Sequence, residues 1–334
     1  MRLNETGVVV QKIRALSRLS QEEFARKIGV SFTTVNRWER NKSRPLPSAC
    51  SRLIELGQGL GLDPSEMTVL GHSAGVAGML WSVDTLEGPC QVTFTNLSGV
   101  LEPTVFAKAL LQNLTIRQKD KDGLVLDMGT GSGVLAIAIA LAGCKNVHAV
   151  DVSPAALQAC VDNAKTNCVE KRIRPIRSDL VDGVSDKYDL VVANPPTFAE
   201  ENGFPRGSPI DLSFFTGVLG HAFVDRLARS VPGILKPTGR LVMVHPSYLD
   251  AVRLRSILEE GGMEMVVVAS QRVSLRVYSS VFKKYGYDGQ GILGKLVERC
   301  LAAGREGLLW RRDADYAFSL DVIEAFKATG KHDN

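Results

Sequence analysis

The glycine-rich stretch at residues 127–133, Asp-Met-Gly-Thr-Gly-Ser-Gly, limits the possible folds of this chain more than any other feature. A short apolar run at residues 123–126 precedes it, and a longer apolar run begins at Val134. Glycine permits a tight turn, and such a turn exposes backbone N–H groups at the start of the following helix. The pattern therefore predicts a strand, a turn that faces a ligand, and a helix.

From about residue 120 onward, strand and helix patterns alternate along the chain. Strands joined by helices are typical of a parallel, doubly wound α/β sheet, in which ligands bind at the carboxyl ends of the strands. Pro232 and Gly233 are expected to end the helix before them. The predicted strands are 123–126, 147–150, 173–176, 188–193, 240–244 and 263–269, and the predicted helices begin at 134 or cover 154–167, 222–230, 250–260, 292–303 and 320–328.

The spacing of the glycines separates this turn from two other nucleotide-binding turns. A P-loop requires a lysine after its second glycine, and no lysine follows here. A dinucleotide-binding turn prefers G-x-G-x-x-G, and Val134 occupies the position of the third glycine. An oxidoreductase that binds a nicotinamide cofactor is therefore disfavoured, and a comparison of ligand binding would decide the matter.

Acidic residues follow the next two predicted strands. Asp151 ends the second strand, where a carboxylate can accept hydrogen bonds from both hydroxyl groups of a ribose. Asp179 follows the third strand in the sequence Ser-Asp-Leu. Dinucleotide enzymes share the first of these features, so it indicates the fold more than the identity of the cofactor.

The sequence Asn194-Pro195-Pro196-Thr197 directly follows the predicted strand 188–193. The side-chain oxygen of Asn194 and the carbonyl oxygen of Pro195 are suited to accept both N–H hydrogens of a planar amine or amide. That contact would turn the nitrogen lone pair toward an electrophile, and two prolines would hold the carbonyl group rigidly.

Together these motifs resemble the class I S-adenosylmethionine-dependent methyltransferases. The D-x-G-x-G-x-G turn is similar to their motif I, and Asn-Pro-Pro is similar to the N/D-P-P-Y/F motif of enzymes that methylate planar nitrogens. Residues 101–111 resemble the segment before motif I in release-factor glutamine and small-domain rRNA guanine methyltransferases. The resemblance implies S-adenosyl-L-methionine as cofactor, with Asp127, Gly129, Gly131, Gly133, Asp151, Asp179 and Asn194 in its site and Asn194, Pro195, Pro196 and Thr197 at the reacting nitrogen.

The sequence departs from this family at Thr197, where the family has a tyrosine or a phenylalanine that stacks on the target group. Phe198 follows at the next position, displaced by one residue. The methyl acceptor therefore stays open among a protein glutamine, an rRNA guanine, a DNA adenine and a small amine. The alternative function is a transcription regulator in which the methyltransferase fold serves only as a sensor of S-adenosylmethionine.

The N-terminal 62 residues have a different character. They contain eleven Lys/Arg and five Asp/Glu, a net charge of +6, whereas the remainder sums to −2. Ser20 and Glu23 form a capping-box pattern, and Gly29 is placed to end the helix that follows. The predicted helices are 8–17, 21–28, 32–40 and one from Ser48 to Gly57.

Four short helices with a glycine at the tight turn resemble the lambda-repressor/Cro type of helix-turn-helix domain. The resemblance implies DNA binding through the start of the third helix, which enters the major groove in such domains. A dimer, or help from the second domain, is expected because one such domain binds weakly. The residues implied at base edges are Thr33, Thr34, Asn36 and Arg37, and those implied at phosphates are Arg40, Lys42 and Arg44.

The sequence thus predicts an α/β methyltransferase domain of Rossmann-like fold, preceded by a small all-α domain. The six cysteines form no C-x-x-C pair, and no cluster has the spacing of metal ligands, so no metal is expected. No apolar run of about 18 residues and no signal peptide are present, which favours a cytoplasmic protein without a membrane segment. The predicted parts are 1–62, a linker or docking segment at 63–92, the methyltransferase domain at 93–275, and an extension of unknown role at 276–334.

Overall fold

The computed structural model describes residues 4–43, 45, 49, 52–53, 56–57, 59–62, 79–86, 88–94, 100–200, 209–217, 219–303, 309–312 and 315–328. Arg44, Ser48 and residues 63–78 of the predicted linker lie outside this part of the chain. None of the helices in the described part is long and apolar enough to cross a membrane.

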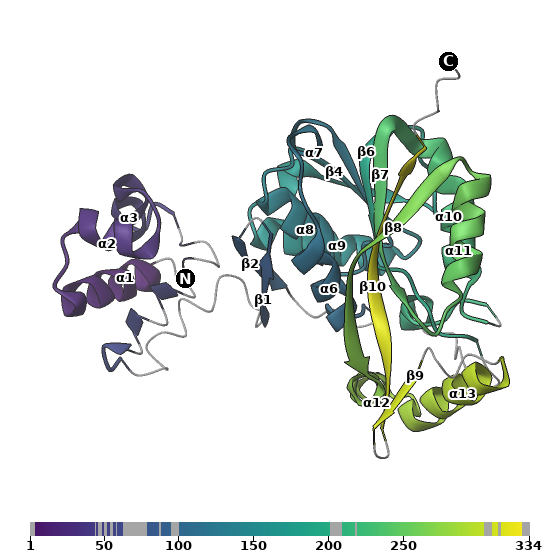
Figure 1. Ribbon diagram of the computed structural model, residues 1–334. Helices are drawn as coiled ribbons and strands as arrows, with labels where there is room; N and C mark the ends of the chain where they lie inside the picture. The colour runs from purple at the N-terminus through teal and green to yellow at the C-terminus, as the bar shows by residue number, and fades with distance from the viewer. Residues whose placement is uncertain are drawn as a thin grey trace.

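The N-terminal unit consists of short helices around a small apolar core (Figure 1). The second helix has the predicted bounds, because the side chain of Ser20 accepts a hydrogen bond from the Glu23 N–H and Glu23 bonds back to the Ser20 N–H. Gly29, with φ of 72°, ends it. The helices are α1 (Asn4–Ser17), α2 (Gln21–Ile28) and α3 (Phe32–Glu39).

A buried carboxylate fixes how these helices pack. Glu39 at the end of α3 is 7% exposed, and its Oε1 lies 2.5 Å from Nε of Arg14 on α1. Gln21 at the start of α2 donates to the other oxygen of the same carboxylate at 2.5 Å. One side chain therefore holds all three helices, while Phe24 and Trp38 fill the core between them.

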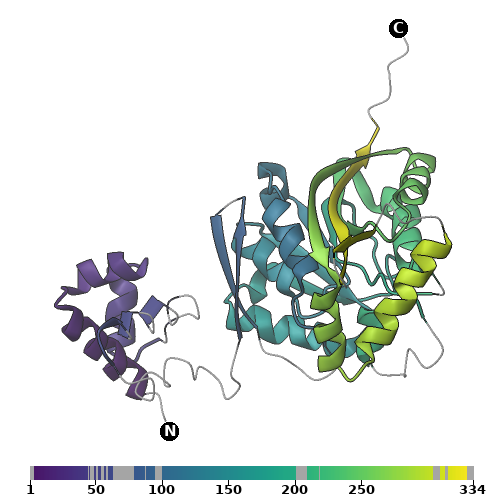
Figure 2. The same ribbon diagram turned by 60° about the horizontal axis from the view of Figure 1, so that its bottom comes forward.

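The C-terminal unit is a three-layer α/β structure built on one large sheet (Figures 1 and 2). Its strands run in the order β5-β4-β3-β6-β7-β10-β8, and β9 pairs with β10 outside this path. The five strands from β5 to β7 are mutually parallel, whereas β10 runs antiparallel to both of its neighbours. The strands are β3 (Leu124–Met128), β4 (Asn146–Asp151), β5 (Ile173–Arg177), β6 (Tyr188–Ala193), β7 (Leu235–Pro246), β8 (Met263–Ser274), β9 (Leu309–Arg312) and β10 (Asp315–Lys327).

Helices cover both faces of this sheet, with α6, α8 and α9 on one face and α10 and α11 on the other (Figure 1). The strands β3 and β6 are buried on both sides, so apolar residues occupy consecutive positions in them rather than alternating, apart from Asp127 in β3 and Tyr188 and Asp189 in β6. The helices are α6 (Val105–Asn113), α7 (Gln118–Asp122), α8 (Val134–Leu141), α9 (Pro154–Thr166), α10 (Ala222–Ile234), α11 (Ala251–Glu260), α12 (Leu275–Lys284) and α13 (Gly289–Ala302), with short 3-10 turns η1 (Glu170–Arg172) and η2 (Pro209–Ser213).

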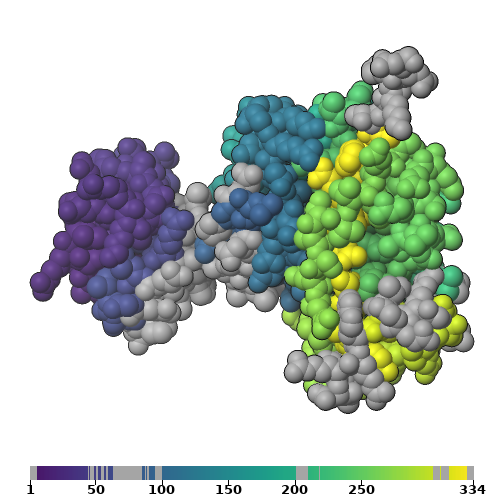
Figure 3. All heavy atoms as spheres, in the orientation of Figure 1, coloured from purple at the N-terminus to yellow at the C-terminus, as the bar shows by residue number. Residues whose placement is uncertain are grey.

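The prediction of a helix at 320–328 was wrong, because these residues belong to the strand β10. Phe318, Leu320 and Val322 alternate along the strand, and a register shift after Val322 brings Ile323 to the buried side as well. A short apolar run with such a shift fits helical spacing about as well as strand spacing, so periodicity alone did not separate them. The space-filling view shows only small patches of β10 between neighbouring segments (Figure 3).

Residues in the predicted linker form a hairpin of β1 (Met79–Thr85) and β2 (Gly88–Phe94). Val92 is fully buried, and Asn167 at the end of α9 exchanges hydrogen bonds with the backbone N–H and carbonyl of Thr93. The hairpin is therefore docked on the sheet unit. We propose that this unit extends from residue 79 to 328, rather than from 93 to 275.

The helix α10 continues through Pro232 to Ile234, although we expected it to end before the proline. The proline costs one backbone hydrogen bond in the last turn. Val231 is fully buried and Ile234 is 7% exposed, so apolar packing on the sheet keeps this turn helical.

Candidate functional site

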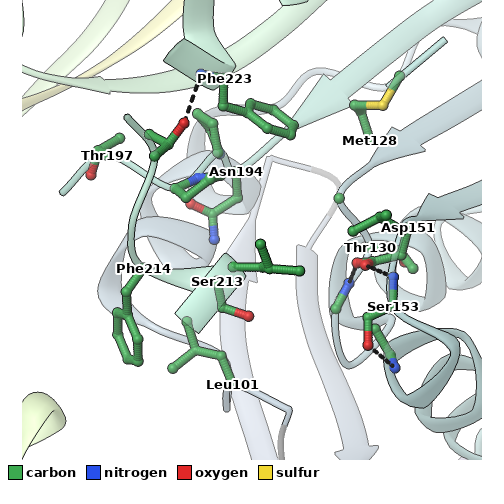
Figure 4. A pocket seen from close by; sticks show the side chains of 18 of the residues that line it. Leu101, Met128, Thr130, Asp151, Ser153, Asn194, Thr197, Ser213, Phe214 and Phe223 are labelled. Atoms are coloured by element: carbon green, nitrogen blue, oxygen red, sulfur yellow. Dashed lines mark hydrogen bonds between the residues drawn. The ribbon is translucent and has the colours of Figure 1, made fainter. Parts of the chain in front are cut away.

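A cavity of about 350 Å³ opens at the carboxyl ends of β3, β4 and β6, where the predicted motifs meet (Figure 4). The glycine turn and Asp151 form one side, and Asn194 with Thr197 forms the other. Two further segments, 100–107 and 212–216, form much of the remaining wall, together with residues of α10 and α12. The structure thus brings together residues that lie up to 178 positions apart in the sequence, from Val100 to Tyr278.

The three glycines of the turn all adopt positive φ angles, of 74°, 51° and 83° at positions 129, 131 and 133. Two successive N–H groups, those of Gly129 and Thr130, donate to the Val150 carbonyl at 2.9 Å and tie the turn to β4. A Cβ atom at Gly133 would lie 2.8 Å from Sγ of Cys160, so this glycine permits close packing of α8 on α9. A Cβ atom at Gly131 would meet nothing within 4 Å, because that glycine faces the cavity.

Asp127 is fully buried beneath the turn and does not line the cavity. Its Oδ2 accepts hydrogen bonds from the Thr130 hydroxyl at 2.7 Å and the Ala136 N–H at 3.1 Å. Its Oδ1 is buried without a partner among the described residues. Loss of hydration raises the pKa of Asp127 to about 7. We therefore propose that Asp127 shapes the turn instead of contacting the cofactor directly.

The raised pKa of Asp127 predicts a stability effect. Between about pH 4 and pH 7 the folded protein keeps a proton that the unfolded chain has released, so this group lowers stability as the pH rises. The variant Asp127→Asn cannot ionise. We expect its free energy of unfolding, relative to the natural chain, to increase from pH 4 to about pH 7 and then to level off.

Urea unfolding at a series of pH values would measure this difference. Burial lowers the pKa of His245 to about 4, which gives a slope of the opposite sign between about pH 4 and 6.5, but that contribution is common to both proteins and cancels. Parallel stability curves for the two proteins would contradict the assignment.

Asp151 stands at the end of β4 with both carboxylate oxygens directed by backbone groups. Oδ2 accepts from the Gly131 N–H at 3.0 Å, and Oδ1 accepts from the Ser153 N–H at 2.9 Å. Burial raises the pKa of Asp151 above its ordinary value. Because each oxygen retains a lone pair at the wall of the cavity, the carboxylate fits the two hydroxyl groups of a ribose.

Asp179 also lines the cavity, but Arg226 of α10 holds its carboxylate. The two guanidinium nitrogens lie 3.1 and 3.0 Å from the two carboxylate oxygens, and both side chains are about half exposed. The predicted contact with an adenine amine stays a prediction, and it would compete with this pair. The sequence offered no signal for Arg226, since the contact depends on where α10 packs.

Asn194, Pro195 and Pro196 follow β6 and line the cavity opposite Asp151 (Figure 4). Thr197 is 3% exposed, and its hydroxyl lies 2.8 Å from the hydroxyl of Tyr248, which comes from the segment after β7. The fourth position of this motif is thus anchored in the interior. Phe198 likewise packs into an aromatic cluster, with ring centroids 4.9 Å from Phe282 and 5.8 Å from Tyr248.

The C-terminal residues of unknown role contribute Tyr278 to the wall and support other wall segments from behind. Tyr278 of α12 lines the cavity, and the Tyr285 hydroxyl accepts a hydrogen bond from the Glu102 N–H at 3.0 Å. Tyr287 donates to the buried carboxylate of Asp211. The segment after β8 therefore supports both wall segments, 100–107 and 212–216. No pattern in the sequence indicated these contacts.

Two buried histidines of the sheet, His148 on β4 and His245 on β7, lie outside the cavity lining. His148 Nδ1 is 2.9 Å from the hydroxyl of Tyr188, a contact inside the sheet. His245 is 1% exposed, and its Nε2 has no hydrogen-bond partner in the described part of the chain. Among the residues that the structure describes, no group of three His, Cys, Asp or Glu side chains is arranged to hold a metal ion.

In the N-terminal unit, the residues implied in DNA contact lie on the side of α3 away from the core. Thr33, Arg37 and Arg40 are exposed, and Asn36 is half-buried beside them. Thr34 is engaged in capping, since its N–H donates to the Ser31 hydroxyl and the two hydroxyls lie 2.8 Å apart.

Comparison with known proteins agrees with these two units. The family model described as ribosomal protein L11 methyltransferase matches residues 103–195, and the helix-turn-helix model matches residues 10–62. The fold and the cavity at the strand ends therefore define a methyltransferase, with S-adenosylmethionine as its cofactor, and the N-terminal unit is a helix-turn-helix domain.

The chain is also similar to individual proteins of known name. The "putative protein N5-glutamine methyltransferase" of Methanocaldococcus jannaschii is 31% identical over 174 residues, which are 52% of this chain and 86% of that protein. The release factor glutamine methyltransferase of Bordetella pertussis is 36% identical over 42% of this chain and 54% of its own length. A T. thermophilus 16S rRNA methyltransferase structure, with AdoMet and guanosine, has a TM-score of 0.44 and 19% identity over 76% of this chain and 51% of that one. This chain belongs to the S-adenosylmethionine-dependent methyltransferase family of the M. jannaschii protein.

Proposed function

We propose that this enzyme methylates the side-chain amide nitrogen of a protein, with glutamine as the acceptor residue, and that its N-terminal domain binds DNA. The observation that supports a glutamine acceptor is the character of the cavity surface around Asn194. Its charge and the anchoring of Thr197 both disfavour a nucleic-acid base, and neither disfavours an amide.

The charge of the cavity supports a protein acceptor. Among its described lining residues are four carboxylates, of which Asp151 is assigned to the cofactor and Glu102 is paired with Lys284, and a single guanidinium, that of Arg226, which is already paired with Asp179. A nucleic acid brings phosphates, which require a surplus of Lys and Arg. The carboxylates at this site are Glu102, Asp151, Asp179 and Glu200.

The position of Thr197 supports the same conclusion. Enzymes that act on a base extrude it into a pocket and stack it between aromatic or apolar side chains. Here the position after Asn-Pro-Pro is a threonine whose hydroxyl is bonded to Tyr248, and the neighbouring Phe198 is 3% exposed, so neither position of the motif offers a ring for stacking; the half-buried ring in the lining is that of Phe223 on α10. A glutamine amide needs no stacking partner, because it is held by its N–H hydrogens.

The residues of this chain contribute to the reaction by orienting the acceptor amide toward the cofactor. S-adenosylmethionine supplies an electrophilic sulfonium methyl group when it is bound. The Asn194 side-chain oxygen and the Pro195 carbonyl accept the two N–H hydrogens of the amide, which turns the nitrogen toward the cofactor side of the cavity. Asp151 and the glycine turn hold the cofactor, the turn through the close backbone approach that glycine permits, and Pro196 restricts the backbone that carries the acceptor contact.

The names of the relatives support a glutamine acceptor, since the M. jannaschii protein and the B. pertussis enzyme are both named for glutamine methylation. The helix-turn-helix domain supports binding to DNA through Thr33, Thr34, Asn36, Arg37 and Arg40. Such domains read DNA as dimers with two half-sites, so a homodimer is part of the proposal. A cytoplasmic location follows from the same function, because that is where DNA and newly made proteins meet in a bacterial or archaeal cell.

Methyl transfer from radiolabelled S-adenosylmethionine to a cell extract tests the acceptor. We expect label that protease releases and nuclease does not, and N5-methylglutamine after complete enzymatic digestion of the labelled protein. Heat-denatured enzyme is the control. Label that follows nucleic acid through nuclease treatment would contradict the protein acceptor, and absence of transfer to every fraction would favour the alternative of a regulator that only senses S-adenosylmethionine.

A further inference from the structure

Phe32 is an exposed aromatic residue at the first position of α3. Its side chain is 44% exposed, whereas the other aromatic residues of the N-terminal unit, Phe24 and Trp38, are at most 2% exposed. Helix α3 begins at Phe32, because the side chain of Ser31 caps it by accepting a hydrogen bond from the Thr34 N–H. The exposed ring therefore stands at the end of the helix that meets base edges in domains of this class.

The neighbours of Phe32 define one polar, positively charged face. In an α-helix, positions 32, 36 and 40 lie along one line, and positions 33 and 37 lie directly beside it. Those positions hold Asn36, Arg40, Thr33 and Arg37. The single acidic residue of α3, Glu39, is buried and bonded to Arg14, so its charge is already neutralised within the domain.

The chemistry of the major groove provides an apolar partner for such a ring. The C5 methyl group of thymine is the apolar group that base pairs present there, and phenylalanine is one of the side chains that contact it. We propose that Phe32 binds a thymine methyl group and thereby selects thymine at one position of the DNA site. This inference rests on the proposed DNA binding of the N-terminal domain.

Charge favours DNA over a second protein chain as the partner of this face. If two copies met symmetrically through it, Arg37 and Arg40 of each copy would face the same residues of the other. Phosphates on either side of the groove would instead neutralise both side chains.

The experiment begins with selection of duplexes from a random DNA pool by the full-length protein. In a selected duplex, each thymine is then replaced in turn by deoxyuridine, which lacks only the methyl group. We expect one replacement to weaken binding about four-fold, the effect of exposing one buried methyl group. The variant Phe32→Ala should bind the thymine and deoxyuridine duplexes equally well.

Leu16→Ala is the matched control, because Leu16 is 45% exposed, as Phe32 is 44%, but belongs to α1 and not to α3. It should keep the full sensitivity to deoxyuridine. If no duplex is selected, the proposed DNA binding of the N-terminal domain is refuted, and the proposed role of Phe32 is refuted as well. If a duplex is selected but no single deoxyuridine matters, or if Phe32→Ala stays sensitive, then DNA binding stands and the role of Phe32 is wrong.

Discussion

Replacement of Asn194 by alanine is expected to lower kcat for methyl transfer by roughly two orders of magnitude, the usual cost of a misplaced reacting group. Asn194 lines the cavity at the end of β6, and its side chain is the proposed acceptor of an amide N–H. The variant should still bind S-adenosylhomocysteine, because Asp151 and the glycine turn lie on the other side of the cavity. Single-turnover assays and isothermal titration would measure the two quantities separately.

Asp151→Asn is the informative partner of this variant. Its carboxylate is directed into the cofactor side of the cavity by the Gly131 and Ser153 N–H groups, so its loss should weaken binding of S-adenosylhomocysteine far more than Asn194→Ala does. Unchanged kcat in Asn194→Ala would refute the acceptor contact. A larger loss of cofactor affinity in Asn194→Ala than in Asp151→Asn would assign Asn194 to the cofactor alone.

Replacement of Arg240 by methionine is expected to destabilise the sheet unit by about 3–5 kcal/mol. Arg240 on β7 is 1% exposed, and one of its guanidinium nitrogens lies 2.9 Å from both carboxylate oxygens of Asp120, which is fully buried. A second nitrogen donates to the Thr115 carbonyl at 2.5 Å. The substitution leaves a buried carboxylate without its partner, so the melting temperature should fall by roughly 10 °C.

Asp122→Asn provides the matched comparison, because Asp122 lies on the same helix α7 and forms an ion pair with Lys145 at 2.6 Å. Both side chains of that pair are more than half exposed, so water screens the interaction and the melting temperature should hardly change. Equal effects of Arg240→Met and Asp122→Asn would show that burial does not determine the strength of the Arg240 pair.

Local sequence signals were sufficient where a single segment decides the structure. The capping residues Ser20 and Gly29 set the bounds of α2, and the glycines of the turn adopt the positive φ angles that they alone favour. The same reasoning failed at β10, whose residues form a strand only because β7 and β8 flank it on both sides.

The sequence by itself determined the turn at residues 127–133, the acidic side chain at Asp151, the Asn-Pro-Pro motif and the helix-turn-helix pattern, since each depends on neighbouring residues. Only the tertiary structure decided that Asp127 is buried beneath its turn, that Arg226 holds Asp179, and that Thr197 is anchored by Tyr248. Those contacts join residues between 3 and 51 positions apart, and two of the three depend on how separate segments come together at the strand ends. Packing of this kind is set by the whole core and leaves no periodic trace in the sequence.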